Sequence, residues 1–230
     1  MTRRDRPGYW LDLGLIPYSP AFDIQEQVLE ARIKDQLPST IILQEVPSVF
    51  TIGRTGSRSN ILASHDELQR LGIGVLDVNR GGDITYHGPG QLIVSPLLYL
   101  GDIDLNANQY LHRLEDLVMD LLSTYGISTH KKNGYPGVWR EDAKIGSVGI
   151  AIKHGYTFHG FALNISLDLT PFSLINPCGV SRMPVTSLCQ ILGRDIPVSE
   201  VKKRLRETLA EMFSLKIGDI SLEELRRSLA

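Results

Sequence analysis

Cys178 is the residue of this chain best suited to act as a nucleophile. Pro177 and Gly179 flank it and disfavour both a helix and a core strand, so we expect Cys178 on an accessible turn. The second cysteine, Cys189, lies among apolar neighbours and is expected to be a buried small hydrophobe. A free thiol with a pKa of about 8.5 is only a few per cent thiolate at neutral pH. Cys178 therefore needs a neighbouring positive charge to react efficiently.

Lys144 is the candidate for that charge. It opens the apolar segment Lys144-Ile145-Gly146-Ser147-Val148-Gly149-Ile150, which predicts a strand with the ammonium group at its end. A lysine in this position is ordinarily a solvated turn residue. An ammonium group beside a thiol favours the thiolate, and each unit of pKa shift is worth about 1.4 kcal/mol. Nothing in the spacing brings Lys144 to Cys178, so their pairing is a hypothesis about the fold.

The most glycine-rich segment is Arg80-Gly81-Gly82-Asp83-Ile84-Thr85-Tyr86-His87-Gly88-Pro89-Gly90-Gln91. Its glycines permit positive φ and a close approach of the backbone to a ligand. A plain hairpin is the alternative, because predicted strands lie on both sides. The clustering of Arg80, Thr85 and His87 with these glycines favours a binding loop. It is not a phosphate-binding P-loop, because Gly-Lys-Ser/Thr is missing.

A third segment, Phe158-His159-Gly160-Phe161-Ala162-Leu163-Asn164, alternates small residues with large apolar ones. Such a pattern either lines a narrow apolar slot or fills the core, and the residues alone leave both readings open.

Composition and missing motifs exclude several classes of function. With 24 Lys and Arg against 26 Asp and Glu the net charge is −2, which argues against binding nucleic acid through a broad basic surface. Two cysteines cannot build a disulfide framework. No apolar window is long enough to span a membrane, and the basic N-terminus lacks the apolar region of a signal peptide. We therefore expect a cytoplasmic protein with no membrane partner.

Metal-dependent and serine-dependent chemistry find no support in the motifs. The chain has no Cys-x-x-Cys, no His-Glu-x-x-His and no Gly-x-Ser-x-Gly, and its glycine-rich segments hold no paired carboxylates. We expect no metal site.

The elements that must position these residues mix helices and strands without a regular alternation. Apolar periodicity predicts helices over 20–36, 108–125, 198–214 and 221–229, and strands over 41–46, 73–78, 91–100, 137–139, 145–152 and 158–165. We take Pro96 to mark a bulge or an edge strand. The pattern predicts an α+β fold with a mixed, mainly antiparallel sheet flanked by helices. Residues 1–230 are expected to form one domain, with 195–230 as its helical C-terminal part.

Four motifs together resemble one family. Arg80-Gly81-Gly82-x-x-Thr85-x-His87-Gly88-Pro89-Gly90-Gln91 resembles the signature of the octanoyl-[acyl-carrier-protein]–protein octanoyltransferases of lipoate synthesis. Residues 144–149, 159–164 and 177–179 follow in that family's order and spacing, and weaker similarity extends the match over most of residues 9–192. The resemblance implies the fold of lipoate–protein and biotin–protein ligases.

The resemblance also implies a reaction. The octanoyl group passes from octanoyl-acyl carrier protein to Cys178, and then to a lysine ε-amine on a lipoyl domain. Implied acceptors are the lipoyl domains of 2-oxoacid dehydrogenase E2 subunits and the glycine cleavage H protein. No cofactor is implied, and we expect a monomer.

In this reading Cys178 is the nucleophile and Lys144 lowers its pKa. Whether Lys144 or a histidine accepts the proton in the second step stays open, and His159 is a candidate supporting residue. Backbone N–H groups of the glycines are candidates for an oxyanion hole. The implied substrate-binding residues, which would enclose the acyl chain and its carbonyl, are Arg80, Gly81, Gly82, Asp83, Ile84, Thr85, Tyr86, His87, Ser147, Val148, Gly149, Gly160, Phe161 and Ala162.

Two alternatives belong to different classes. An ATP-dependent lipoate–protein ligase of the same superfamily would need an adenylate site and no nucleophilic cysteine. A non-catalytic module that binds acyl chains or carrier proteins would not need both Cys178 and Lys144. The presence of both residues favours the transferase.

Overall fold

The computed structural model describes residues 6–177, 180–181 and 183–229. Its elements are, in chain order, β1 (Arg6–Leu15), α1 (Tyr18–Ile33), β2 (Ser39–Glu45), β3 (Val49–Ile52), η1 (Arg58–Asn60), α2 (His65–Arg70), β4 (Gly74–Asp77), β5 (Ile84–His87), β6 (Gln91–Leu97), α3 (Leu100–Ile103), α4 (Ala107–Ser123), β7 (His130–Lys131), β8 (Gly137–Arg140), β9 (Ala143–Lys153), β10 (Tyr156–Asn164), η2 (Thr170–Leu174), α5 (Leu188–Leu192), α6 (Val198–Phe213), β11 (Leu215–Asp219) and α7 (Leu222–Leu229). The candidate nucleophile Cys178 lies outside the described residues.

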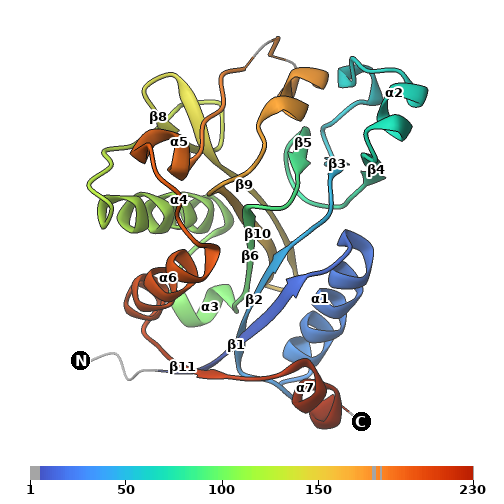
Figure 1. The fold of residues 1–230 in the computed structure, drawn as a ribbon. Helices are drawn as coiled ribbons and strands as arrows, with labels where there is room; N and C mark the ends of the chain where they lie inside the picture. The colour runs from blue at the N-terminus through green and yellow to red at the C-terminus, as the bar shows by residue number, and fades with distance from the viewer. Residues whose placement is uncertain (1–5, 178–179, 182, 230) are drawn as a thin grey trace.

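A mixed sheet runs through the centre of the molecule (Figure 1). Its eight strands lie in the order β11-β1-β2-β6-β10-β9-β8-β7. The first three run parallel to one another, and every pairing from β2 to β7 is antiparallel. The expected α+β fold with a mixed, mainly antiparallel sheet is confirmed.

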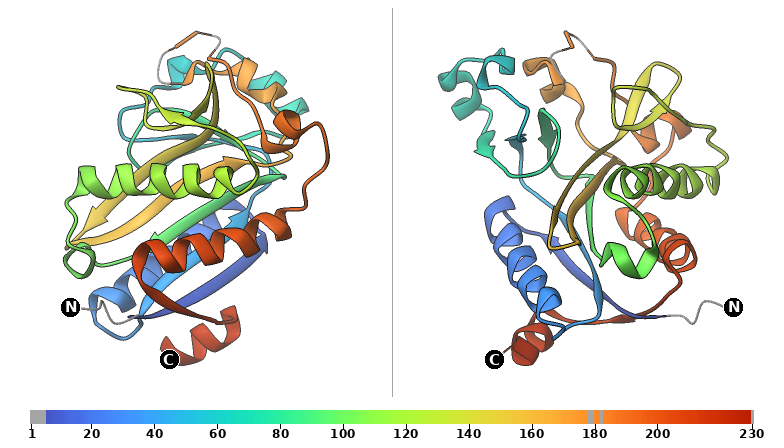
Figure 2. Two further views of the ribbon diagram at one scale, coloured as in Figure 1. Left: turned by 90° about the vertical axis from the view of Figure 1, so that its left-hand side faces the viewer. Right: turned by 180° about the vertical axis from the view of Figure 1, so that it is seen from behind.

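Helices cover both faces of this sheet (Figure 2). Because neighbouring side chains of a strand point to opposite faces, β2 contributes to both layers. Its Ile41 and Leu43 pack in one apolar cluster with residues of α4 and α6. Ile42, between them, packs in another cluster with residues of α1 and α7. Apolar spacing in α1 and α4 matches these buried faces, as the sequence predicted.

A small second sheet, in the order β4-β3-β5, lies beyond the end of α1 (Figure 1). Its own apolar cluster includes Phe50, Ile84 and Phe172, the last from η2. The loop that joins β4 to β5 is the glycine-rich segment. The small sheet therefore holds that loop against the large sheet.

Pro96 lies in a central strand, so the edge-strand reading is wrong. Its strand, β6, lies between β2 and β10. The regular pairing of β6 with β10 ends at Val94. A Cβ on Gly160 of β10 would lie 2.8 Å from Pro96 Cδ. The sheet tolerates the proline because Gly160 has no side chain there and the ladder is interrupted on that side.

The C-terminal part is not purely helical. Residues 195–230 contain α6 and α7 as expected, but also the strand β11. β11 pairs with β1, with Leu215 opposite Arg6. β1, β3, β5 and β7 were likewise not predicted, because they are short or lack a clean alternation of apolar and polar residues.

Candidate active site

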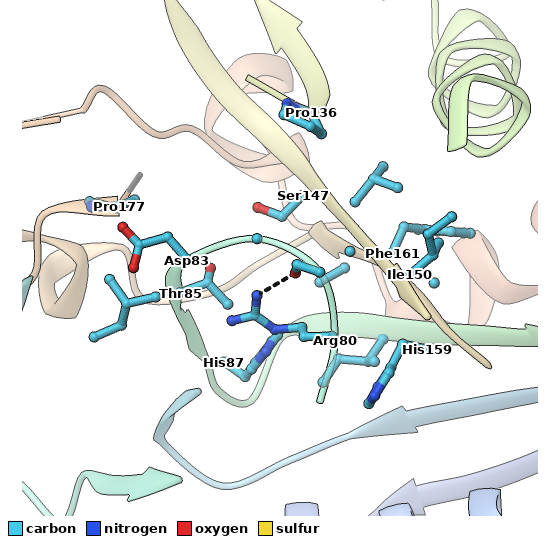
Figure 3. A pocket seen from close by; sticks show the side chains of 18 of the residues that line it. Arg80, Asp83, Thr85, His87, Pro136, Ser147, Ile150, His159, Phe161 and Pro177 are labelled. Carbon is cyan, nitrogen blue, oxygen red and sulfur yellow. Dashed lines mark hydrogen bonds between the residues drawn. The ribbon is translucent and has the colours of Figure 1, made fainter. Parts of the chain in front are cut away.

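One cavity collects nearly all of the predicted site residues (Figure 3). It lies between the large sheet and the glycine-rich loop. Residues 80–85, 147–149 and 160–162 line it, together with Lys144, His87 and His159. The segment over 158–164 therefore lines an apolar slot rather than only filling the core.

Tyr86 and Cys178 are the two predicted site residues that are not among the described residues lining the cavity. Tyr86 does not line the cavity: its side chain packs edge-on against Phe50 and Phe172, and its hydroxyl lies 3.0 Å from that of Ser48. Cys178 lies outside the described residues, but Pro177, directly before it in the chain, is buried and lines the cavity (Figure 3).

The glycine-rich loop is fixed by its backbone. Gly81 donates its N–H to the carbonyl of Ile150 in β9, at 2.9 Å. The carbonyls of Arg80, Gly82 and Asp83 accept hydrogen bonds from the backbone of residues 53–55. Gly53 allows this approach, because a Cβ there would lie 2.3 Å from the Gly82 carbonyl oxygen. The N–H of Gly81 is therefore already used and is not part of an oxyanion hole.

Arg80 is held beneath the loop rather than exposed to solvent. Its guanidinium donates to the backbone carbonyl of Thr51 at 2.7 Å and to the Thr51 hydroxyl at 2.8 Å. It also donates to the carbonyl of Gly81 at 3.0 Å. Only 9% of Arg80 is exposed, and the residue lines the cavity, so its positive charge lies at the cavity wall.

His87 is a neutral member of a buried hydrogen-bond chain. Gln91 donates its amide N–H groups to the carbonyl of Tyr86 and to Asn164 Oδ1. Its Oε1, 2.6 Å from His87 Nδ1, therefore accepts a hydrogen bond from the imidazole N–H. His87 Nε2 then accepts from the Thr51 hydroxyl at 3.1 Å. Burial, and secondly the charge of Arg80, lower the pKa of His87 to about 3. Both ring nitrogens are occupied.

This chain of hydrogen bonds continues to the backbone of Lys144. Asn164 Nδ2 donates to the carbonyl of Thr186 at 3.0 Å. Thr186 in turn donates its N–H to the carbonyl of Lys144, also at 3.0 Å, and Lys144 donates its own N–H to Pro184. A continuous polar path therefore joins the glycine-rich loop to the candidate catalytic lysine.

His159 is also neutral, and its contacts differ from those of His87. Its ring stacks on Phe22 at 5.2 Å between centroids, and its Nε2 lies 2.6 Å from Asn79 Oδ1. Its backbone has φ of 56°, and its N–H donates to the side chain of Gln25. Burial, followed by the charges of Arg80 and Arg54, lowers the pKa of His159 to about 3.

Lys144 is buried and tightly enclosed. It is 8% exposed, and its Nζ lies 5.3 Å from the centroid of the Trp139 ring, within cation–π range. The pairing of β8 with β9 shifts register between Val138 and Trp139. Such a shift changes the direction of the side chains next to it. Gly137 provides the space, because a Cβ there would lie 2.5 Å from Lys144 Cε.

The segments on both sides of Cys178 are anchored at the cavity. On one side, Asn176 donates its N–H to the carbonyl of Asn60, and Ile175 bridges to Ile61. On the other, Val185 bridges to Lys144. Of the described residues near Cys178 in the chain, Pro177 lines the cavity and Val185 lies beside Lys144.

Several lining residues carried no signal in the sequence. Tyr18 and Gln25 come from α1, Gln44 from β2 and Ser95 from β6. They reach the cavity only because these elements pack beside the glycine-rich loop. Cys189 is partly buried as a small hydrophobe against the main core, and its Sγ lies 3.2 Å from the backbone N–H of Ile196.

Comparison with known proteins assigns the family. The model of the lipoyl protein ligase A/B catalytic domain matches residues 17–210. An octanoyltransferase of Syntrophobacter fumaroxidans is 38% identical over 96% of this chain and 96% of its own length. This chain belongs to the octanoyltransferase family. Another octanoyltransferase, from Syntrophotalea carbinolica, is 41% identical over 84% of this chain and 89% of its own length.

The octanoyltransferase family is an acyltransferase family, so the expected enzyme class is confirmed. Its fold is shared with a lipoate–protein ligase A solved with bound ATP. That structure superposes with a TM-score of 0.79, covering 97% of this chain and 92% of its own, at 17% identity. At that identity the likeness concerns the fold alone.

Two kinds of feature are absent from the part of the chain that the structure describes. No three or more His, Cys, Asp or Glu side chains gather there in a group that could hold a metal ion. No helix in the described part of the chain is long and apolar enough to cross a membrane.

Proposed function

We propose that this chain transfers an octanoyl group from octanoyl-acyl carrier protein to a lysine of a lipoyl domain, through a thioester on Cys178. The observation that carries the proposal is one cavity lined by Lys144, by Pro177 next to Cys178, and by the small and apolar residues 160–162. The names of the octanoyltransferase relatives indicate that the transferred acyl group is octanoyl.

In the first step the Cys178 thiolate attacks the thioester carbonyl of the donor. A new carbon–sulfur bond forms to Cys178, and the bond to the carrier's thiolate breaks. The Lys144 ammonium stabilises the Cys178 thiolate beforehand and protonates the departing thiolate afterwards. The step exchanges one thioester for another, so it needs no ATP.

In the second step the acceptor amine attacks the Cys178 thioester. A carbon–nitrogen bond forms, the bond to Cys178 breaks, and the now neutral Lys144 amine takes the proton from the attacking nitrogen. This restores the Lys144 ammonium and the Cys178 thiolate. An amide replaces a thioester, which makes transfer to the acceptor run downhill.

The structure favours Lys144 over the histidines as the proton carrier. His87 and His159 both have a pKa lowered to about 3, mainly by burial, and both are held in side-chain hydrogen bonds. A base with so low a pKa holds a proton poorly near neutral pH. These histidines instead keep the cavity wall in place.

Intact-mass measurement after mixing with octanoyl-acyl carrier protein, without ATP or acceptor, tests the proposal. We expect a hydroxylamine-labile octanoyl adduct on Cys178. Cys178→Ser should lose it, whereas Cys189→Ser should retain it. Lys144→Met should slow adduct formation at least a hundredfold. Lys153→Met changes an exposed lysine of the same strand and should have no effect.

Two results would contradict the transferase. One is full transfer by Cys178→Ser, which would remove the covalent mechanism. The other is acceptor octanoylation only with free octanoate and ATP, which would identify a ligase.

A further inference from the structure

A continuous row of side chains crosses the floor of the acyl cavity. Ser147 of β9 pairs with Ala162 of β10, Ala162 with Ile93 of β6, and Ile93 with Gln44 of β2. Directly paired residues point to the same face of a sheet, and all four line the cavity. The row begins at Ser147, three residues after Lys144 on the same strand, and ends at Gln44.

Gln44 gives this row a polar end without a partner. The residue is 3% exposed, and among the described residues its Oε1 has no hydrogen-bond partner. Buried amide oxygens are nearly always paired, so an unpaired one on a residue that lines a ligand cavity points to a hydrogen-bond donor brought by the ligand. The neighbouring Ile93 and Ala162 are apolar.

The row is about one strand spacing longer than the proposed substrate. Three strand spacings separate Ser147 from Gln44, which is about 14 Å. From carbon–carbon bonds of about 1.5 Å, an extended octanoyl chain measures about 9 Å from carbonyl to methyl, and a decanoyl chain about 11 Å. With its carbonyl above Ser147, an octanoyl chain ends over Ile93. A decanoyl chain brings its last carbons against the Gln44 amide.

We propose that Gln44 limits the length of the aliphatic chain that this enzyme transfers, an inference that rests on the proposed octanoyl transfer. A longer apolar chain covers the polar amide and supplies no hydrogen bond to it. A ten-carbon chain with a terminal hydroxyl does supply one, by donating to Oε1. Selection at this end of the cavity therefore acts through polarity as well as through length.

Rates of Cys178 acylation by octanoyl-, decanoyl- and 10-hydroxydecanoyl-acyl carrier protein test the proposal. The variant Gln44→Met keeps the length of the side chain and removes its hydrogen-bonding groups. We expect wild type to prefer octanoyl over decanoyl about tenfold or more, and Gln44→Met to reduce that ratio to about two. We also expect 10-hydroxydecanoyl to outperform decanoyl in wild type but not in Gln44→Met. Gln69→Met, which changes an exposed glutamine of α2, is the matched control.

Each outcome separates this inference from the proposed function. Failure of wild type to accept octanoyl would remove the proposed function itself. Normal octanoyl acylation with the same decanoyl-to-octanoyl ratio in wild type and Gln44→Met would overturn the role of Gln44 alone. Circular dichroism of both variants establishes that they are folded.

Discussion

At the scale of single residues, Thr51 is the junction of the buried polar path. Its hydroxyl accepts from Arg80 and donates to His87 Nε2. Thr51 is fully buried in β3, and Arg80 and His87 are more than nine-tenths buried, so water does not readily replace the hydroxyl if it is lost. One side chain therefore links Arg80 of the glycine-rich loop to His87.

Thr51→Val tests this junction with an almost isosteric change. Leaving Arg80 and His87 without a shared partner should lower the free energy of unfolding by about 1–3 kcal/mol, measured by urea denaturation. Thr208→Val is the control, because the Thr208 hydroxyl bonds only to a carbonyl of its own helix. Equal losses of unfolding free energy in the two variants would show that the Thr51 hydroxyl contributes no more than an ordinary threonine hydroxyl.

The sequence predicted the cavity residues that lie in distinctive motifs and missed those that lie in ordinary elements. Arg80, His87 and Lys144 belong to segments where glycines surround a polar side chain. Gln44 is a single glutamine in an apolar strand, and its place follows from the pairing of β2 with β6. Tyr86 fell in a motif, yet alternation along β5 turns it to the small sheet's own core.

At the scale of elements, Gly53 decides how two segments meet. It lies directly after β3, and it lets the chain there approach the glycine-rich loop that precedes β5. Gly53→Ala places a Cβ 2.3 Å from the Gly82 carbonyl oxygen, which is backbone and cannot move alone. We expect the glycine-rich loop to shift, with octanoyl transfer falling at least tenfold. The value of kcat/KM should fall clearly, whereas the melting temperature should change little.

Gly218→Ala is the control for Gly53→Ala. Nothing lies within 4 Å of a Cβ at Gly218, and its strand is far from the cavity in sequence. Steady-state kinetics and thermal melting of both variants decide the matter. Unchanged kinetics in Gly53→Ala would mean that the loop position is not critical.

Elements with strong local periodicity were predicted within a few residues, and elements defined by distant partners were not. The helix expected over 108–125 is α4, Ala107–Ser123, with a capping box at Asn106. β11 has five residues, and its partner β1 lies at the other end of the chain. No local pattern reports such a pairing, so the C-terminal part looked helical.

At the scale of the whole molecule, the two neutral histidines make stability depend on pH. The pKa values of His87 and His159 are about 3 in the folded protein, against 6.5 for an unperturbed histidine. Between these values the unfolded chain binds more protons than the folded one. The contribution of these two histidines to the free energy of unfolding is therefore fully present above pH 6.5. It is lost progressively as the pH falls toward 3.

Urea denaturation between pH 7 and pH 5 measures this effect. Below pH 6.5 each histidine should contribute a slope of up to about 1.4 kcal/mol per pH unit. His87→Gln should remove one histidine's share of the slope, whereas replacement of the exposed His65 by glutamine should not. Parallel curves for wild type and His87→Gln would contradict the assignment of His87 as buried and neutral.

The pairing of β1 with β11 also has a consequence for synthesis on the ribosome. β1 leaves the exit tunnel long before the strand that covers its outer edge, because Leu215 pairs with Arg6 from about 210 residues later in the chain. At roughly 5–20 residues per second, the interval is on the order of 10–40 seconds. During that time the nascent chain presents an open strand edge, a template for unwanted pairing with other chains. A chain that stops before β11 contains every described residue that lines the cavity but leaves the edge of β1 open.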